Sequence, residues 1–358
     1  MSKTREELES FLDQEEHRAC QVVVLPDFFL DRLVSLAWNV SDFSKLIEGV
    51  AKRKGGSIDG VSQTEIRGGN AINVASALSN LGATVSPIVC TSAFGLQQIN
   101  YFFRDIPVDN SHVKIRDRAS ITTALEFRNG DEKTNVMLRD LGSLSDFGPQ
   151  DLDDNDYSLI DGADFVCLFN WAGTIKFGTE LAEAVSARVK RSGKGKTYYD
   201  TADPLPNRAS LPELVERVLK SNKVDILSVN ENEAVAYAKY LDKSFGDQSV
   251  QEFAVLAMEA ARILRKHFSC RIDLHTSRFS ATLKGKNEVV VPSFKVQVLR
   301  ATGAGDSWTA GNILGDHNGL SDECRLMLAN AVSACYLSDL QGRHPTWEKM
   351  RSFLADQK

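Results

Sequence analysis

The chain has 358 residues, of which 42% are hydrophobic and 25% are charged. This composition is typical of a folded globular protein and excludes the low-hydrophobicity profile of a disordered chain. The formal net charge of -6 argues against a nucleic-acid or acidic-membrane partner, because those surfaces attract concentrated Lys and Arg.

Several patterns bear on where the protein resides. The charged segment from Met1 to Cys20 lacks an apolar signal core, and no apolar run of about 18 residues follows it, so we expect neither secretion nor a membrane span. The cysteines are scattered without a CxxC pair, which is typical of reduced thiols. The histidines are equally dispersed, and no HExxH motif is present. We therefore expect a cytoplasmic protein without a zinc site.

The first third of the chain contains one clear strand and one clear helix. Residues 21–26 (QVVVLP) form a β-branched run of the kind that is buried in a parallel sheet. Residues 38–66 are mixed, with a basic, glycine-containing stretch, and we expect them to be peripheral. Residues 73–81 carry apolar groups at helical spacing, and Gly82 follows at the position of a C-terminal cap.

The remainder of the chain alternates between strand-like and helix-like segments. Residues 122–127 and 133–138 flank an Asn-Gly pair, which predicts a β-hairpin. Further strands are predicted at 165–169, 197–199, 226–229, near Ile272 and near Val289, and further helices at 181–189, 211–219, 253–268 and from Asp306 onward. This alternation predicts an α/β fold, a doubly wound and mostly parallel sheet with helices on both faces, as one domain over residues 1–358 with a smaller appended piece.

A glycine-rich turn, RATGAGDSW at residues 300–308, precedes the last helical region. Small residues let backbone N–H groups approach an anion, and a helix N-terminus adds partial positive charge, so this turn is suited to a phosphate. Asp306 then lies where a general base accepts a proton from an attacking hydroxyl. The alternative is that the glycines form a tight turn and Asp306 caps a helix.

Two further stretches carry polar side chains next to predicted helices. The stretch RGGNAINVA at residues 67–75 offers two glycines for a hinge and two amides suited to sugar hydroxyls. The stretch NENEA at residues 230–234 follows an apolar strand, so its oxygens lie at the sheet edge where α/β folds bind ligands, and they suit Mg²⁺ held through water. A turn in the first case and a capping box in the second are the structural alternatives.

Together these three stretches resemble the signatures of the PfkB family, which has the ribokinase-like fold. GGNAINVASALSNLGA resembles the first signature, ATGAGDSWTAG resembles the second, and NENEA resembles the N-x-x-E motif, in the family's order and spacing. The resemblance extends from Val22 to Phe353. It implies transfer of a phosphoryl group from ATP, with Mg²⁺, to a hydroxyl of a small sugar or sugar-acid substrate.

The resemblance also implies roles for individual positions. Asp306 matches the catalytic base, and Gly303, Ala304 and Gly305 match its anion hole. Asn230 and Glu233 match the residues that organise the phosphates and, through water, the Mg²⁺ ion. The other matched positions are Asp31 for substrate hydroxyls, Gly68 and Gly69 for the hinge, Asn73 for a substrate contact, Thr276 for the nucleotide loop and Asn330 for the adenine side.

Two peripheral segments, at about 31–66 and 116–140, match the β lid of the family. In the family this lid covers the substrate and often mediates dimerisation. The resemblance therefore implies a lid over the substrate site and a possible homodimer formed through it.

The chain departs from the family pattern in three places. Arg300 stands where relatives carry an Asp that helps to hold a monovalent cation, and a guanidinium cannot bind potassium. The nucleotide loop T-x-G-x-x-G is replaced by TSRFS at residues 276–280, which removes both glycines. The D-x-N-x-R stretch of many sugar kinases is present only loosely from Asp200 onward, so the substrate cannot be inherited from one subfamily.

Two other functions remain open beside the sugar kinase. A nucleoside kinase on the same fold would place a base on the lid side of the site. A catalytically silent sugar-binding or regulatory homologue would retain the fold and lack turnover, which the altered nucleotide loop favours and Asp306 argues against. A Rossmann dehydrogenase is disfavoured, because no GxGxxG follows the first strand.

Overall fold

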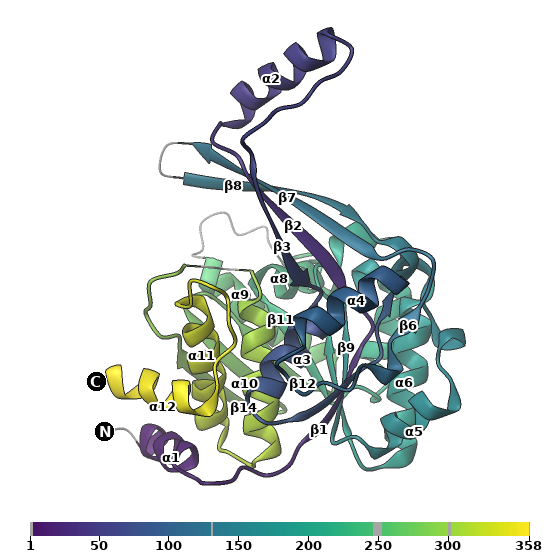
Figure 1. The fold of residues 1–358 in the computed structure, drawn as a ribbon. Helices are drawn as coiled ribbons and strands as arrows, with labels where there is room; N and C mark the ends of the chain where they lie inside the picture. Colours follow the sequence, from purple (N-terminus) through teal and green to yellow (C-terminus); the bar gives the residue numbers. More distant parts are fainter. Residues whose placement is uncertain (1–2, 130–131, 246–252, 300–301, 358) are drawn as a thin grey trace.

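A computed structural model describes residues 3–129, 132–245, 253–299 and 302–357, and it shows an α/β body from which a narrower arm of strands projects (Figure 1). The strands are β1 (Gln21–Leu25), β2 (Phe29–Ser35), β3 (Ser62–Gly68), β4 (Thr84–Pro87), β5 (Cys90–Thr91), β6 (Lys114–Ile115), β7 (Ser120–Asn129), β8 (Glu132–Asp140), β9 (Phe165–Phe169), β10 (Lys196–Asp200), β11 (Ile226–Asn230), β12 (Arg271–His275), β13 (Phe279–Lys284) and β14 (Asn287–Pro292). The helices are α1 (Lys3–Leu12), α2 (Val40–Lys52), α3 (Asn70–Asn80), α4 (Ala93–Phe102), α5 (Asp154–Gly162), α6 (Gly178–Ser192), α7 (Leu211–Leu214), α8 (Glu231–Leu241), α9 (Phe253–His267), α10 (Ala304–His317), α11 (Asp322–Leu337) and α12 (Trp347–Asp356).

The body is built on a large mixed sheet. Within the described ranges it has eight strands in the order β14-β13-β12-β11-β10-β9-β1-β4. In this spatial order the six strands from β12 to β4 pair in parallel, and β13 and β14 add an antiparallel edge. The predicted doubly wound, mostly parallel sheet is confirmed. Strand β1, which was predicted from its β-branched run, lies between β4 and β9.

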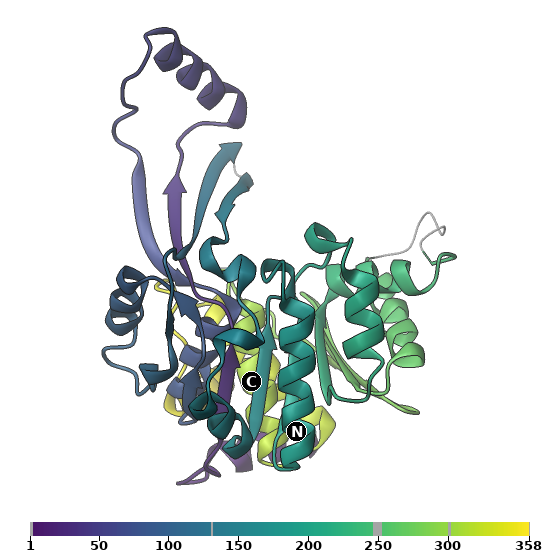
Figure 2. The ribbon, with the colours of Figure 1, turned by 90° about the vertical axis from the view of Figure 1, so that its right-hand side faces the viewer.

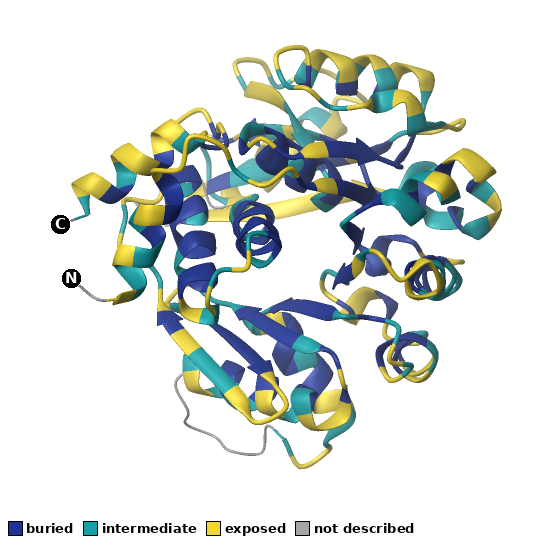
Figure 3. Ribbon diagram, turned by 90° about the horizontal axis from the view of Figure 1, so that it is seen from below, coloured by how far each residue is buried: buried dark blue, intermediate teal, exposed yellow. Residues whose placement is uncertain are grey.

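Successive side chains of the central strands enter two separate cores. Val22 and Val24 of β1 pack in a cluster with residues of α1, α3, α10, α11 and α12. Val23 and Leu25 pack in another cluster with residues of α6, α8 and α9. Because neighbouring side chains of a strand point to opposite faces, helices cover both faces of the sheet. Figure 3 shows the buried residues in the central strands and on the inner sides of the helices.

A second sheet forms the base of the projecting arm, and we call it the small sheet. It consists of β3-β2-β7-β8, with β2 antiparallel to β3 and parallel to β7. Helix α2 connects β2 to β3 at the tip of the arm, away from the body, and none of its residues is buried (Figures 1 and 2). The stretch that was expected to be peripheral therefore contains one helix and one strand.

The predicted hairpin is present as an antiparallel pair. Strand β7 pairs with β8 from Ile121↔Asp140 to Asn129↔Glu132. Gly130 and Asp131 of the predicted turn lie outside the described residues.

The two terminal helices lie side by side at the edge of the body (Figure 1). Arg5 of α1 donates hydrogen bonds to the backbone oxygens of Leu354, at 2.7 Å, and Gln357, at 3.0 Å. Among the helices in the described ranges, none is long and apolar enough to cross a membrane.

Candidate active site

Polar side chains gather where the parallel strands end. Asp27 follows β1, Asn170 follows β9, Asp200 ends β10, Asn230 ends β11 and His275 ends β12. The carboxyl ends of parallel strands meet at one edge of a sheet, and α/β folds bind their ligands at this edge. Helices α3 and α10 begin against the same edge and bring two of the sequence motifs to it.

Asp27 is fully buried and holds the start of α3. Its Oδ1 accepts a hydrogen bond from the Ala71 N–H, and its Oδ2 accepts bonds from the Asn70 N–H and the Asn170 side-chain amide, all at 2.9 Å. Burial raises the pKa of Asp27, although these hydrogen bonds oppose the rise. Asp27 therefore fixes the Gly68–Gly69 segment and the amides that follow it.

The GAGD turn, residues 303–306, begins helix α10. Gly303 caps the helix in the left-handed conformation, with φ 90°, and no side chain caps the first turn. The N–H groups of a first helical turn have no partner within the helix, so they are available to an anion. The His275 ring lies behind the turn, since a Cβ atom added at Gly305 would be 3.1 Å from its Cε1. Burial lowers the pKa of His275 to about 4, and the ring is neutral at neutral pH.

Asp306 lies in the first turn of α10, and only 7% of its surface is exposed. Its Oδ1 accepts a hydrogen bond from the Asn70 amide and its Oδ2 accepts one from the Asn73 amide, both at 2.9 Å. Burial raises the pKa of Asp306 to about 7 despite these two bonds, and the nearby Asp200 and Asp27 add to the rise. The carboxyl group is thus able to exchange a proton near neutral pH.

Two more buried carboxyl groups extend this acidic centre. Burial and the charge of Asp27 raise the pKa of Asp200 to about 6. Burial and the charge of Asp200 raise the pKa of Glu233 well above its usual value. Carboxylates that repel one another in a buried site favour an arriving cation or a shared proton.

Asn230 and Glu233 form a reciprocal cap at the start of α8. The Asn230 Oδ1 accepts from the Glu233 N–H at 3.0 Å, and the Glu233 Oε2 accepts from the Asn230 N–H at 2.9 Å. The Glu233 Oε1 also accepts from the Asn230 side-chain amide at 2.8 Å. The capping-box alternative is therefore correct for the local structure. Each Glu233 carboxylate oxygen accepts one of these bonds and can also accept a hydrogen bond from water.

Thr276 and Asn330 are committed to internal hydrogen bonds. The Thr276 hydroxyl donates to the Phe279 backbone oxygen at 2.8 Å and closes the turn between β12 and β13. The Asn330 Oδ1 accepts from Trp308 Nε1 at 3.0 Å and from the Ser280 hydroxyl, and its amide donates to the Pro292 oxygen at 3.1 Å. The predicted contact of Asn330 with adenine stays a prediction, and it requires some of these bonds to open.

A cavity of about 720 Å³ lies between this edge of the sheet and the small sheet. Asp31, Gly69, Asn70 and Thr302 are among its lining residues, whereas Asp306 lies behind Asn70. Gly68 is packed so closely against the Asp31 carboxylate that a Cβ atom at this position would displace it. The small sheet lines the cavity with both polar and apolar residues. The apolar ones are Phe29, Leu33, Ile66, Ala124 and Met137, and the polar ones are Asp31, Arg32, Thr122, Glu126, Asn135 and Arg139.

The structure brings most of the sequence-predicted site residues to this one place. Asn73 donates a hydrogen bond to Asp306, and the Gly303–Gly305 turn directly precedes Asp306 in sequence. The neighbouring cavity contains or adjoins Asp31, Gly68 and Gly69. Arg300, the most unusual departure in the sequence, lies outside the described residues.

Sequence reasoning missed Asp27, assigned no role to Asp200, and noted Asn70 only as one of two amides suited to sugar hydroxyls. Asn70 bonds to Asp306 directly, and it directly follows the glycine pair that had been singled out. Asp27 is a carboxylate just beyond the first strand, a position that could have been selected from the sequence, whereas the family resemblance selected Asp31, which lies in β2.

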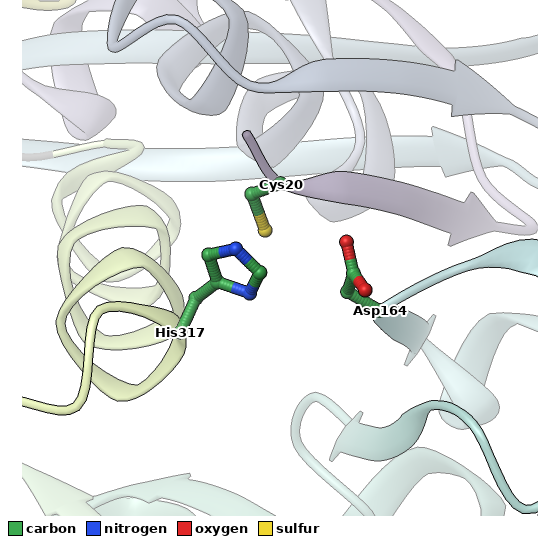
Figure 4. A group of neighbouring side chains, drawn as sticks. All are labelled: Cys20, Asp164 and His317. Carbon is green, nitrogen blue, oxygen red and sulfur yellow. The ribbon is translucent and has the colours of Figure 1, made fainter. Parts of the chain in front are cut away.

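A separate group of polar residues lies at the opposite end of the sheet (Figure 4). Cys20 and Asp164 precede β1 and β9, His317 ends α10, and one potential metal-binding atom of each lies within 4.8 Å of the others. The His317 Nε2 is 2.7 Å from the Ala19 oxygen, and the Asp164 Oδ2 accepts from the Gln21 N–H at 2.9 Å. Burial raises the pKa of the Cys20 thiol to about 12. These bonds brace the chain where it enters β1, and we assign no metal to the group.

Comparison with known proteins places this geometry among kinases. Residues 42–349 match the sequence profile of the pfkB family carbohydrate kinases. No curated protein sequence matches the chain significantly.

Solved structures share the fold at low sequence identity. A ribokinase from Cryptococcus neoformans var. grubii serotype A, in complex with ADP, superposes with a TM-score of 0.72 at 17% identity, over 95% of this chain and 99% of the ribokinase. An adenosine kinase from Sinorhizobium meliloti superposes with a TM-score of 0.70 at 16% identity, over 96% and 99% of the two chains. A ribokinase from Arabidopsis thaliana, complexed with ribose and ATP, has a TM-score of 0.70 at 18% identity, over 94% and 99%. With its fold, its three motifs and this profile match, the chain belongs to the pfkB family of carbohydrate kinases.

Proposed function

We propose that the protein transfers the terminal phosphoryl group of ATP to a hydroxyl of a small sugar or sugar acid, with Asp306 as the general base. The observation that carries this proposal is the buried Asp306 carboxylate, whose pKa is raised to about 7, one turn from the uncapped N-terminus of α10. A base and an anion site on the same helical turn place the proton acceptor beside the group that is transferred.

The acceptor hydroxyl enters from the cavity that Asn70 and Thr302 line. In the resting structure the Asn70 amide donates a hydrogen bond to Asp306 Oδ1. The substrate hydroxyl replaces Asn70 as the donor to this oxygen. Asn73 keeps its bond to Oδ2 and holds the carboxylate in orientation. Asp306 accepts the hydroxyl proton as the oxygen attacks the terminal phosphorus of ATP, and the bond from this phosphorus to the bridging oxygen breaks so that ADP leaves. The Gly303–Gly305 N–H groups stabilise the negative charge of the transferred phosphoryl oxygens.

The residues of the acidic edge suit a Mg²⁺ ion bound through water. Mg²⁺ usually keeps several of its waters and would supply charge neutralisation on the phosphates. Glu233 and Asn230 already bond to each other, so they would hold such waters and not the ion itself. Asp200 adds a second carboxylate close enough to raise the pKa of Glu233.

The small sheet serves as the lid in this proposal. It forms the outer wall of the cavity through β2, β3, β7 and β8 and is joined to the body next to the Gly68–Gly69 pair. Dimerisation through this sheet remains a proposal that derives from the family resemblance. Residence in the cytoplasm remains a proposal that derives from the scattered cysteines.

A nucleoside is the second candidate substrate, and one observation favours it. The cavity of about 720 Å³ is larger than a single sugar ring requires, and its outer wall carries apolar side chains from Phe29, Leu33 and Met137. These apolar side chains, within a wall that also carries charged residues, are suited to the face of a base.

A substrate screen tests both candidates. Pentoses, hexoses, keto-deoxy sugar acids and nucleosides are each incubated with ATP and Mg²⁺, and ADP release is measured for the wild type and for Asp306→Asn. We expect one class to release ADP with the wild type only. ADP release from nucleosides alone would select the second candidate, and no release from any class would favour a catalytically silent homologue.

A further inference from the structure

The Gly303–Gly305 turn, which we call the anion-hole turn, contacts a tyrosine on one side. The Tyr336 hydroxyl, at the end of α11, donates a hydrogen bond to the Thr302 backbone oxygen at 2.7 Å. A Cβ atom added at Gly303 would be 2.7 Å from the same hydroxyl oxygen, so the phenol lies directly against the turn. Tyr336 is only 4% exposed.

The other face of Tyr336 stacks on His344. Their ring centroids are 4.9 Å apart and the ring planes meet at 21°. His344 is 6% exposed, and its Nδ1 lies 2.9 Å from an Arg67 guanidinium nitrogen and 3.0 Å from the Ser76 hydroxyl. A guanidinium has no acceptor, so Nδ1 accepts from Arg67 and carries no proton, and the imidazole is neutral.

Arg67 connects this stack to the small sheet. It is a residue of β3 and directly precedes the Gly68–Gly69 pair at the start of α3. A cavity of about 180 Å³ lies at the junction, and Arg67, Asn73, Thr302 and Tyr336 are among its lining residues. Three contacts therefore run from the base of the small sheet to the anion-hole turn: Arg67 to His344, His344 to Tyr336, and Tyr336 to Thr302.

We infer that Tyr336 and His344 are positioning residues that couple the small sheet to the anion-hole turn. This inference rests on the proposed function, because it assigns the Gly303–Gly305 N–H groups to a phosphoryl group. The Thr302 carbonyl belongs to the peptide that leads into Gly303, so the Tyr336 bond fixes the orientation of the backbone from which those N–H groups project. Arg67 then fixes the stack to the strand that forms one wall of the substrate cavity.

The primary test is Tyr336→Phe, which removes the hydroxyl and retains the ring stack. We expect kcat to fall about 3- to 10-fold, the scale of one neutral hydrogen bond, with substrate and ATP KM values changed less than about 2-fold. Amide hydrogen exchange at residues 302–306 should become faster, while exchange in the rest of α10 stays the same. Tyr240→Phe is the matched control, because Tyr240 is 37% exposed on α8, and it should change neither quantity.

A double-mutant cycle tests the coupling itself. Arg67→Lys retains the positive charge and loses the planar fork that reaches His344. If the contacts act as one chain, Arg67→Lys also speeds exchange at residues 302–306, and the double variant with Tyr336→Phe is no faster than the faster single variant. Effects that multiply, or an Arg67→Lys variant with wild-type exchange at the turn, overturn the inference.

The exchange measurement separates this inference from the proposed function. It is made on the resting protein without substrate, so it does not depend on turnover. A substrate screen without ADP release together with coupled exchange would contradict the proposed kinase activity and leave the coupling in place. Substrate turnover with uncoupled exchange would contradict the coupling alone.

Discussion

At the scale of single residues, the proposed chemistry depends on how far the protein destabilises the ionised carboxylate of Asp306. The carboxylate is buried, and its neighbours include Asp27 and Asp200, so its ionised form is poorly stabilised. The amides of Asn70 and Asn73 oppose this effect only in part, and the pKa rises to about 7. A carboxyl group with this pKa accepts a proton more readily than an exposed Asp, which is the property that a general base needs.

The pH dependence of turnover follows from this pKa. Asp306 accepts a proton only when it is ionised, so we expect kcat to rise with pH through an apparent pKa near 7 and to fall below it. Asn73→Ala removes a hydrogen bond that lowers this pKa, so the midpoint of the profile should move to higher pH. A wild-type profile that is flat from about pH 5 to 9 would show that Asp306 is not the base.

At the scale of elements, α8 illustrates how a structural cap and a ligand role occupy the same residues. We expect Glu233→Gln to raise the Mg²⁺ concentration for half-maximal turnover by about 10-fold, with a smaller change in the substrate KM. The reason is that a neutral amide attracts metal-bound water less strongly than a carboxylate. Titration of Mg²⁺ at saturating substrate measures this effect.

The control for Glu233→Gln is a capping box away from the site. Asp153 and Asp156 cap α5 with the same reciprocal bonds. Asp156→Asn should lower stability without a change in Mg²⁺ dependence. If Glu233→Gln likewise lowers stability without a change in Mg²⁺ dependence, Glu233 is only a helix cap.

The GAGD turn yields a prediction about monovalent cations. A potassium ion beside this turn requires carbonyl and acidic oxygens, but the Thr302 carbonyl already accepts from Tyr336 at 2.7 Å. The sequence places Arg300, outside the described residues, where relatives carry the acidic ligand. We expect turnover to be the same when potassium is replaced by a bulky organic cation, and Arg300→Asp to restore part of a potassium response. Strong activation of the wild type by potassium would contradict this expectation.

Some elements were predictable from sequence and others were not. Strand β1 and helix α3 followed from local patterns, because a β-branched run and a helical spacing of apolar residues are complete within a few residues. Helix α2 was missed, since the basic and glycine-containing residues near it obscured its periodicity and it contributes no buried residue to a core. Contacts such as that between Asn70 and Asp306 join positions 236 apart in sequence, and no local pattern encodes them.

At the scale of the whole molecule, a buried ionic network links the inner strand β12 to the helices of the site. Asp273 of β12 accepts from the Asn312 amide of α10 at 2.8 Å and lies 3.3 Å from the Arg325 guanidinium of α11. Arg271 also pairs with Asp273, at 2.9 Å. Burial acts to raise the pKa of Asp273, but Arg271 and Arg325 outweigh it and lower the pKa to about 2.

Loss of one partner from this network should destabilise the fold. We expect Arg325→Met to lower the free energy of unfolding by about 3–5 kcal/mol, because it leaves a buried carboxylate with one cation fewer. Denaturant titration measures the change. The exposed Arg32, which pairs with Glu65 at 2.6 Å, is the matched control, and Arg32→Met should cost at most about 1 kcal/mol.

The same network should appear in acid unfolding. Asp273 has a lower pKa in the folded state than in the unfolded chain, so its contribution to stability is present above about pH 4 and is lost as the pH falls towards 2. Asp273→Asn should remove this part of the pH dependence. An equally steep loss of stability in that variant would assign the acid sensitivity to other carboxylates.

The most direct test of the proposed kinase activity is the turnover of Asp306→Asn on the substrate that the screen identifies. The substitution retains the size of the side chain and removes its ability to accept a proton at neutral pH. We predict that ADP release falls by about 10²- to 10⁴-fold, the usual scale for loss of a general base, while the thermal midpoint and the substrate Kd stay near those of the wild type. Near-wild-type turnover in this folded variant would contradict the role of Asp306 and with it the proposed mechanism.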